Sequence, residues 1–394
     1  MHEIIMIIKE GFGNILRSLG LIIILGTTLG ILLQHTGSTD AMASYIVRKV
    51  GESRSALAMS ITGFIVGLPL FCDSGYIVLS GLNKSLSKRT GTPIMVMSVS
   101  LATGLYSVHC LIPPHPGAAS AAGIIGADIG KLILYGIVVA IPAAIVGFLW
   151  AKYAGKKVTV APQEDEGPVA ETTHKPKVIK AFLPVLVPII LIAARSFFTI
   201  DTTAPNSLFN LLISAGDPVI ALSIGVLLAF NCKRGWNKKT VSLLFNDAIE
   251  KAGGILVIIG AGGAFGAILA ATKIGEQFSE VLALGSMGIL FPFLLTFILK
   301  TAQGSSTVAI ITAASIVLPL LPALGLNNET GKLLCVLSMG AGSMMISHAN
   351  DAYFWVITKF SGLEMKPMLK VYSGATMLMG LISLAMVYLL SQLL

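Results

Sequence analysis

Two polar stretches interrupt long apolar segments of this chain, and their residue types suit the binding of a small hydroxylated anion. The first is Cys72-Asp73-Ser74-Gly75, inside residues 61–82, and the second is residues 300–307, inside residues 291–318. The second stretch contains Gly-Ser-Ser-Thr, which at the start of a helix offers backbone N–H groups, hydroxyls and a positive dipole end. A neighbouring lysine adds a cation, and amide and hydroxyl groups suit the OH groups of a sugar acid.

Two further polar motifs lie within apolar segments, at residues 109–120 and 340–355. The prolines at 113, 114 and 116 exclude a continuous helix and free backbone carbonyls. Irregular backbone at membrane depth persists only where it is buried in protein or lines a cavity. We therefore expect all four polar stretches to meet near the middle of the membrane.

These four stretches supply the candidate functional residues. The candidate substrate-binding residues are Ser74, Gly75, His115, Lys300, Gln303, Gly304, Ser305, Ser306, Thr307, Ser347 and Asn350, and the candidate proton-coupling residues are Asp73, His109, His348 and Asp351. A charged aspartate at the bilayer centre costs about 2.5–3.5 kcal/mol on insertion scales, which favours a functional role. Structural roles stay open: a helix cap for Asp73, a capping network at 348–351, packing or turn roles for the histidines, and a Lys300 that reaches the membrane surface.

The composition indicates an all-α polytopic membrane protein. Of 394 residues, 55% are hydrophobic and 12% are charged, and the mean hydropathy is +0.86, whereas soluble proteins carry about 25% charged residues. The net charge of +8 comes from basic residues between apolar spans, which fits the positive-inside rule better than nucleic-acid binding. Four scattered cysteines form no zinc or disulfide pattern, and we expect no metal and no cofactor.

The apolar pattern predicts full spans, broken spans and re-entrant hairpins. The full spans are about 14–34, 131–151, 179–199, 216–232, 253–272 and 368–392; the broken spans are 92–128 and 332–360; the hairpins are 55–88 and 287–322. Basic clusters flank the first hairpin on both sides, so a hairpin that enters and leaves on the cytoplasmic side satisfies the positive-inside rule. Residues 234–251 suit an interfacial amphipathic helix.

The halves of the chain repeat with opposite starting sides. Residues 1–151 form the first repeat, residues 152–235 hold a cytoplasmic linker (152–178) and two connecting spans, and residues 236–394 form the second repeat. Gly26–Gly37 resembles Gly262–Lys273, and each is followed by a hairpin, a broken span and a final span. An inverted-topology repeat of this kind is typical of secondary transporters, which bind substrate at broken helices.

From about residue 10 onward, the chain resembles the gluconate permease (GntP) family of the ion transporter superfamily. The motifs that carry the resemblance are FCDSGYIVL, VHCLIPPHPGAAS, GAGGAFG, TAQGSSTVAIITAAS and GAGSMMISHANDAYFW. The family implies a multi-pass protein of the bacterial inner membrane that imports gluconate or a related small hydroxylated monocarboxylate by proton symport, and no enzyme. The superfamily implies its fold and a homodimeric elevator, in which the hairpins and broken spans move.

Three departures from the family pattern bear on the substrate. Family members usually have Glu-Val-Gly where this chain has Asp73-Ser74-Gly75, often have Arg where it has Lys300, and usually have two further spans before residue 10. The alternative functions are a Na⁺-coupled organic-anion symporter and a cation/proton exchanger of the same superfamily. An intramembrane hydrolase lacks a recognisable nucleophile motif in this sequence.

Overall fold

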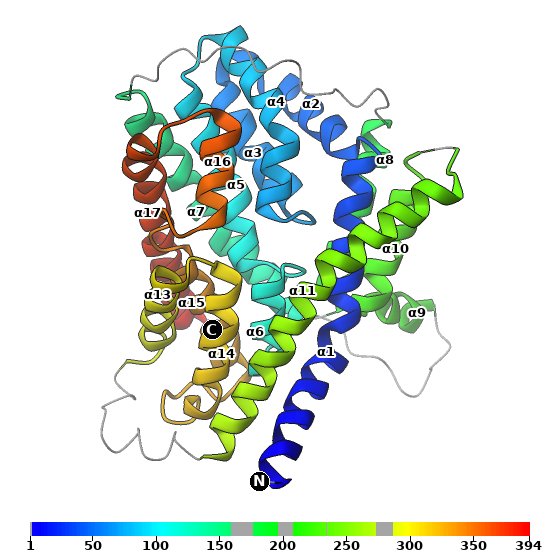
Figure 1. Cartoon of the computed structure of the whole chain (residues 1–394), viewed down its shortest axis with the longest axis vertical. Helices are drawn as coiled ribbons and strands as arrows, with labels where there is room; N and C mark the ends of the chain where they lie inside the picture. Colours follow the sequence, from blue (N-terminus) through cyan, green and yellow to red (C-terminus); the bar gives the residue numbers. More distant parts are fainter. Residues whose placement is uncertain (1, 159–175, 196–207, 234, 273–286) are drawn as a thin grey trace.

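The structure is a computed structural model that describes residues 2–158, 176–195, 208–233, 235–272 and 287–394. These residues form helices and contain no β-strand, which confirms the all-α prediction (Figure 1). Among them, six helical segments are long and apolar enough to cross a membrane. Most of the predicted cytoplasmic linker, residues 159–175, lies outside the described residues. Residues 196–207, which include the end of the span predicted at 179–199, also lie outside them.

The continuous helices match the predicted full spans. They are α1 (His2–His35), α7 (Ile129–Gly155), α8 (Val178–Arg195), α10 (Pro218–Phe230), α11 (Lys238–Ala271) and α17 (Met365–Leu393). Shorter elements are α2 (Ser38–Val50), α9 (Leu208–Ala215) and the 3₁₀ turns η1 (Glu52–Arg54) and η3 (Leu318–Leu320). The helix expected at 234–251 is continuous with the span that follows it, since α11 runs from Lys238 to Ala271.

Two helical hairpins and two broken helices lie where the polar stretches interrupt the apolar pattern. The hairpins are α3 (Ser55–Gly67) with α4 (Cys72–Thr90), and α13 (Leu290–Gln303) with α14 (Ser306–Val317). The broken helices are α5 (Ile94–Leu111) with α6 (Pro116–Ile125), and α15 (Glu329–Met344) with α16 (Ala352–Ser361). In Figure 1 the hairpins extend from opposite ends of the molecule and turn their breaks toward its middle.

Three of the four breaks have a local chemical cause. Pro116 occupies the first turn of α6, where its missing N–H is tolerated, and the preceding Pro113–Pro114 bond is cis. Gly304 ends α13 with φ 81°, a left-handed conformation that glycine adopts without steric cost. Ser305 and Asp351 then cap α14 and α16, respectively, with their side-chain oxygens.

The first arm of each hairpin packs closely against the first half of the broken helix in the same half of the chain. A Cβ atom on Gly104 of α5 would lie 2.2 Å from the Ser60 carbonyl oxygen of α3. A Cβ atom on Gly342 of α15 would lie 2.3 Å from the Phe293 carbonyl oxygen of α13. The second arms cross over, so that α4 packs on α16 and α14 packs on α6. The two halves therefore use the same pattern of contacts and interlock.

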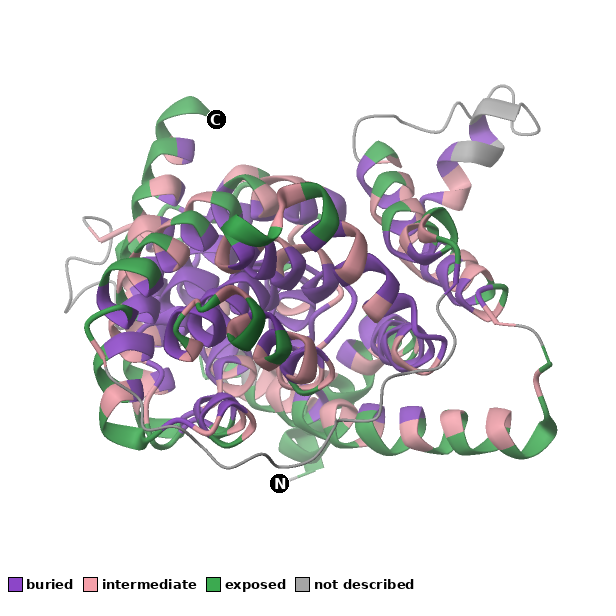
Figure 2. Ribbon diagram, turned by 90° about the horizontal axis from the view of Figure 1, so that it is seen from above, coloured by how far each residue is buried: buried purple, intermediate pink, exposed green. Residues whose placement is uncertain are grey.

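Burial divides the molecule into a bundle and a group of flanking helices. The apolar window within α5 and α6 is 94% buried, whereas that within α11 is 22% buried. Figure 2, seen from above, shows buried residues gathered in one bundle with further helices reaching out on one side. The broken helix α5–α6 therefore lies at the protein centre, away from lipid.

We predict that both ends of the α3–α4 hairpin face the cytoplasm. A cysteine at the exposed Ser53 or at Lys88 should react with a membrane-impermeant maleimide only in inside-out vesicles, because basic residues surround both positions. The native cysteines at 72, 110, 232 and 335 are buried, so background labelling should be low. Asn327→Cys, between α14 and α15, is the control and should react only from the outside. Labelling of Ser53→Cys and Lys88→Cys from opposite sides would rule out a re-entrant hairpin.

Candidate functional site

In the first half of the chain, a histidine joins the helix break to the tip of the hairpin. His115 lies between α5 and α6, and its Nε2 donates a hydrogen bond to the Gly67 carbonyl at the end of α3, at 2.7 Å. The His109 ring contacts the His115 ring edge-on, with centroids 4.8 Å apart. Both histidines are buried. The hydrogen bond to Gly67 satisfies a carbonyl that the end of a helix leaves without an intrahelical partner.

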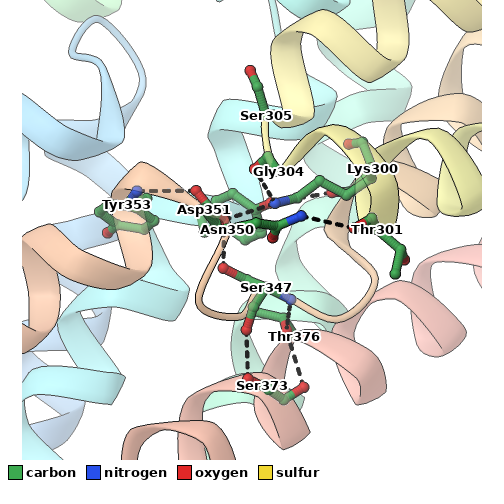
Figure 3. A network of polar contacts seen from close by, with 12 residues as sticks. Lys300, Thr301, Gly304, Ser305, Ser347, Asn350, Asp351, Tyr353, Ser373 and Thr376 are labelled. Carbon is green, nitrogen blue, oxygen red and sulfur yellow. Dashed lines mark hydrogen bonds and ion pairs between the residues drawn. The ribbon is translucent and has the colours of Figure 1, made fainter. Parts of the chain in front are cut away.

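In the second half, an ion pair makes the corresponding connection. The Lys300 ammonium donates to the Gly304 carbonyl at 2.6 Å and to Asp351 Oδ2 at 2.7 Å. The Ser347 hydroxyl donates to the same carboxylate oxygen, and Asp351 Oδ1 accepts the Tyr353 N–H at 2.9 Å (Figure 3). The side chains of Lys300 and Asp351 are 0% and 8% exposed. The hairpin tip is thus fixed to the break between α15 and α16.

Gly304 brings this hairpin tip into direct contact with the second break. A Cβ atom at position 304 would lie 2.1 Å from the Asn350 carbonyl oxygen, a distance that no side chain permits. Asn350 Nδ2 donates to the Thr301 carbonyl at 2.7 Å. At the same break, Ile346 has φ 41°, which is a strained conformation for a β-branched residue.

The first turn of α14 lies between the two breaks. A Cβ atom on Gly117 of α6 would lie 3.2 Å from the Thr307 Cα. The Cys110 thiol, at the end of α5, lies beside the hydroxyls of Ser306 and Ser343. Gly340 of α15 in turn packs against Cys110, because a Cβ there would lie 2.7 Å from the Cys110 carbonyl oxygen. The structure therefore brings three of the four polar stretches together at this helix start.

The start of α14 has the chemistry of an anion site. The first turn of an α-helix leaves its N–H groups without intrahelical carbonyl partners, and Ser305 Oγ accepts one of them, from Val308, at 3.3 Å. Ser306 is buried and Thr307 is half-buried. Ser305 is also half-buried, and its side chain points away from Lys300 (Figure 3). Lys300 is therefore not the free cation beside this helix start that the sequence predicted, because its ammonium is bonded to Asp351 and Gly304.

The start of α4 borders a second candidate pocket, a cavity of about 200 Å³. It is lined by residues of α1, the first hairpin tip and α11: Thr27, Gly30, Ile31, Gln34, Leu70, Phe71, Ser74 and Lys251. Asp73, next to Ser74, is half-buried, and its carboxylate is close enough to that of Asp351 to interact electrostatically. Sequence reasoning missed Thr27, Gln34 and Lys251. Lys251 lies just before the apolar run at 253–272, and this position could have indicated that it is a candidate site residue.

A cluster of buried tyrosines, which the sequence analysis did not single out, connects the two broken helices. The rings of Tyr106 and Tyr353 are stacked with centroids 5.7 Å apart, and Tyr76 and Tyr372 meet Tyr353 edge-on at 6.2 and 6.1 Å. The Tyr353 hydroxyl donates to the Ala102 carbonyl of α5 at 3.2 Å. These contacts fix α16 against α5 and α4.

Several predicted site residues have other surroundings. His348 contributes its backbone carbonyl to a turn closed by the Asp351 N–H at 2.9 Å, and its side chain is half-buried. Gln303 is exposed at the end of α13. Gly75 packs against the broken helix α5, since a Cβ there would lie 2.8 Å from Leu105. Ser347 is fully buried against Asp351 and receives a hydrogen bond from Ser373 at its carbonyl.

Comparisons with known proteins show which sequences this chain is similar to. A family model described as GntP family permease matches residues 1–394. The chain is 33% identical to a gluconate permease of Pseudomonas aeruginosa, over 99% of this chain and 88% of that protein. It is 31% identical to the D-serine transporter DsdX of Escherichia coli, over 98% and 87%, and 30% identical to the inner membrane permease YgbN of Escherichia coli, over 96% and 86%.

One solved structure has a similar fold. It is the crystal structure of the Alcanivorax borkumensis YdaH transporter, whose reported topology is unusual. The two folds superimpose with a TM-score of 0.68 at 15% sequence identity, over 98% of this chain and 88% of the YdaH chain. At this identity the likeness concerns the fold.

We predict that Gly304→Ala disrupts the second hairpin tip. The new methyl group would overlap the Asn350 carbonyl and would also occupy a left-handed conformation, which costs on the order of 1–3 kcal/mol before any clash. Gly325→Ala is the matched control: Gly325 has φ 70°, and nothing lies within 4 Å of its added Cβ. The melting temperature of the purified protein should fall further for Gly304→Ala than for Gly325→Ala. Equal decreases would show that the contact with Asn350 is unimportant.

Proposed function

Because the chain belongs to the GntP permease family and is a multi-pass transporter of the bacterial inner membrane, we propose that it imports a small hydroxylated carboxylate together with a proton. Its relatives include proteins named gluconate permease and D-serine transporter. Gluconate and D-serine share a carboxylate and a hydroxyl group, so this pair of groups defines the substrate class. The relatives are permeases and transporters, and we propose no enzymatic step.

The start of α14 is the observation that carries this proposal. Its N–H groups, the hydroxyls of Ser305, Ser306 and Thr307, and the positive end of the helix dipole favour a carboxylate. Secondary transporters of this kind bind anionic substrate groups at the N-termini of half-helices near the bilayer midplane. Asn350 and Gln303, both exposed beside this turn, suit the hydroxyl groups of the substrate.

Asp73 is the best candidate for the coupling group. A monocarboxylate carries one negative charge, and moving it into a negative-inside cell costs about 2.3 kcal/mol per 100 mV. Co-transport of one proton cancels this charge. Asp351 is already paired with Lys300, whereas the structure gives Asp73 no ion pair with any of the described residues. Asp73 is half-buried at the start of α4, next to the cavity at Ser74.

An elevator movement is supported by the way the bundle meets the flanking helices. Helix α10 packs against both α1 and α8, and α1 packs along α11. A narrow gap lies between these helices and the bundle. Its lining is entirely apolar: Ile22, Leu29, Leu68, Pro69, Pro113, Pro114, Ile129, Ile133, Val185, Pro188, Ile189, Ile192, Pro218 and Leu222. Apolar contact is non-directional, so sliding along this lining breaks no hydrogen bond. The bond from the Ser315 hydroxyl of α14 to the Gly262 carbonyl of α11, at 2.8 Å, would have to break.

The helix α11 is poorly buried within one chain. In a homodimer its exposed side would pack against the partner or face lipid. The window of α11 that could span the membrane is only 22% buried within one chain. Exposed large side chains, including Val257 at 64% and Phe265 at 44%, lie along it. We propose that the flanking helices form the static scaffold of the dimer.

We predict that Ser306→Leu abolishes transport while leaving membrane insertion unchanged. A leucine side chain at this buried position would fill the space at the start of α14 where the carboxylate binds. Counterflow of labelled gluconate and of labelled D-serine in proteoliposomes measures the loss and identifies the substrate. Ser391→Leu, near the exposed end of α17, is the control and should transport as the wild type does. Unchanged substrate affinity in Ser306→Leu would refute the binding site.

We also predict that Asp73→Asn separates exchange from coupling. The amide cannot release a proton, so the variant should still exchange substrate across the membrane but lose accumulation driven by a pH gradient. The control is Glu329→Gln, which changes an exposed carboxylate paired with Lys131 and should retain accumulation. If Asp73→Asn accumulates substrate with a pH gradient, or if wild-type uptake follows only a Na⁺ gradient, the proton assignment fails.

A further inference from the structure

The surroundings of Lys300 are those of a cation-binding cage. Its ammonium lies in the last turn of α13 and is bonded to the Gly304 carbonyl at 2.6 Å and to Asp351 Oδ2 at 2.7 Å. That carboxylate also accepts a hydrogen bond from the Ser347 hydroxyl. The lysine side chain is 0% exposed. The buried ammonium thus bonds one oxygen atom of the hairpin tip and one of the broken helix.

The two helix ends beside the Lys300 ammonium each favour the charge that lies next to them. The C-terminus of α13 is the negative end of its dipole and favours the ammonium. Asp351 is the N-cap of α16, where the positive end of that helix favours a carboxylate. In transporters with broken helices, unwound backbone carbonyls and the C-terminal ends of half-helices are the groups that coordinate Na⁺. Lys300 therefore occupies a position whose ligands suit a small monovalent metal cation.

The ammonium also fixes the geometry of the neighbouring anion site. It joins Gly304, which directly precedes the Ser305–Thr307 turn, to Asp351 at the second break. Asn350, next to Asp351, donates a hydrogen bond to the Thr301 carbonyl at 2.7 Å. The cation thus holds the two segments that flank the start of α14, without itself pointing toward Ser305 (Figure 3).

We infer that the Lys300 ammonium is a tethered cation that takes the place of a bound Na⁺ between the second hairpin tip and the α15–α16 break. Lys300 is in this sense a positioning residue. Because the cation is covalently part of the chain, it assembles the site without drawing on the Na⁺ gradient. This inference rests on the proposed transport function and deepens it. It gives the reason why the proposed transport does not require Na⁺.

The test removes the tethered cation and supplies a free one. Lys300→Ala leaves the Asp351 carboxylate and the Gly304 carbonyl without the ammonium that they bond, and the Ser347 hydroxyl stays bonded to the carboxylate. The melting temperature of the purified variant should be several degrees higher in NaCl, at a concentration that saturates the site, than in choline chloride at equal ionic strength. The reason is that a ligand that binds the folded state stabilises it. The wild-type protein should show no such difference between the two salts.

Two variants control for a purely structural role. Lys300→Met fills much of the same space with an apolar side chain that offers no oxygen ligand, and it should melt at the same temperature in both salts. Lys300→Ala combined with Asp351→Asn lacks the anionic ligand and should also not respond to Na⁺. The inference is overturned if Lys300→Ala is folded but insensitive to Na⁺, or if it fails to fold even in NaCl. A wild type that is itself stabilised by Na⁺ over choline would overturn it as well.

A transport measurement separates this inference from the proposed function. In proteoliposomes, counterflow of the substrate by Lys300→Ala should require Na⁺, whereas wild-type counterflow should be equal in Na⁺ and in choline. If the wild type carries neither gluconate nor D-serine, the proposed function fails, but the effect of Na⁺ on the melting temperature of Lys300→Ala still decides the inference. If the wild type transports and the variant shows no response to Na⁺ in either assay, the inference alone fails.

Discussion

A lysine and an aspartate that are both removed from water must remain paired, because loss of one partner leaves an uncompensated buried charge that costs about 3–5 kcal/mol. Lys300 and Asp351 meet this condition between a hairpin tip and a helix break that are separated by about fifty residues of sequence. The pair fixes Gly304, and through it the first turn of α14. The candidate anion site therefore depends on two charges that are bonded to each other.

The same requirement governs the other polar groups at the centre of the bundle. Each helix break frees carbonyl and N–H groups that no lipid can satisfy, and the neighbouring breaks supply their partners. His115 donates to the Gly67 carbonyl at the end of α3, and Asn350 donates to the Thr301 carbonyl in the last turn of α13. Close glycine contacts, at Gly104 and Gly342, allow the helices to approach near enough for these bonds. The two halves are thereby mutually dependent, while an apolar boundary separates the bundle from α1, α8 and α10.

The sequence by itself determined the class, the helices and the location of the breaks. Apolar runs set the spans because the bilayer requires about 20 apolar residues per helix. Pro113, Pro114 and Gly304 set the breaks because proline and a left-handed glycine cannot continue a helix. These are local effects, so they are readable from neighbouring residues. The motifs around Asp73, His115, Ser305 and Asp351 also identified the family, since their residue types are set by the chemistry at each break.

Only the tertiary structure decided which polar groups bind one another. The sequence placed Lys300 beside the anion site as a free cation, yet its nearest anion, Asp351, follows fifty-one residues later. The cavity that joins Ser74 to Gln34 and Lys251 likewise unites three separate helices. Pairing of buried charges depends on the distances between side chains from different helices, and neither periodicity nor local motif contains those distances. The candidate anion-binding turn at the start of α14 and the Lys300 cation that holds it in place are therefore separate groups. This separation is visible only when the two hairpins and the two broken helices are packed together.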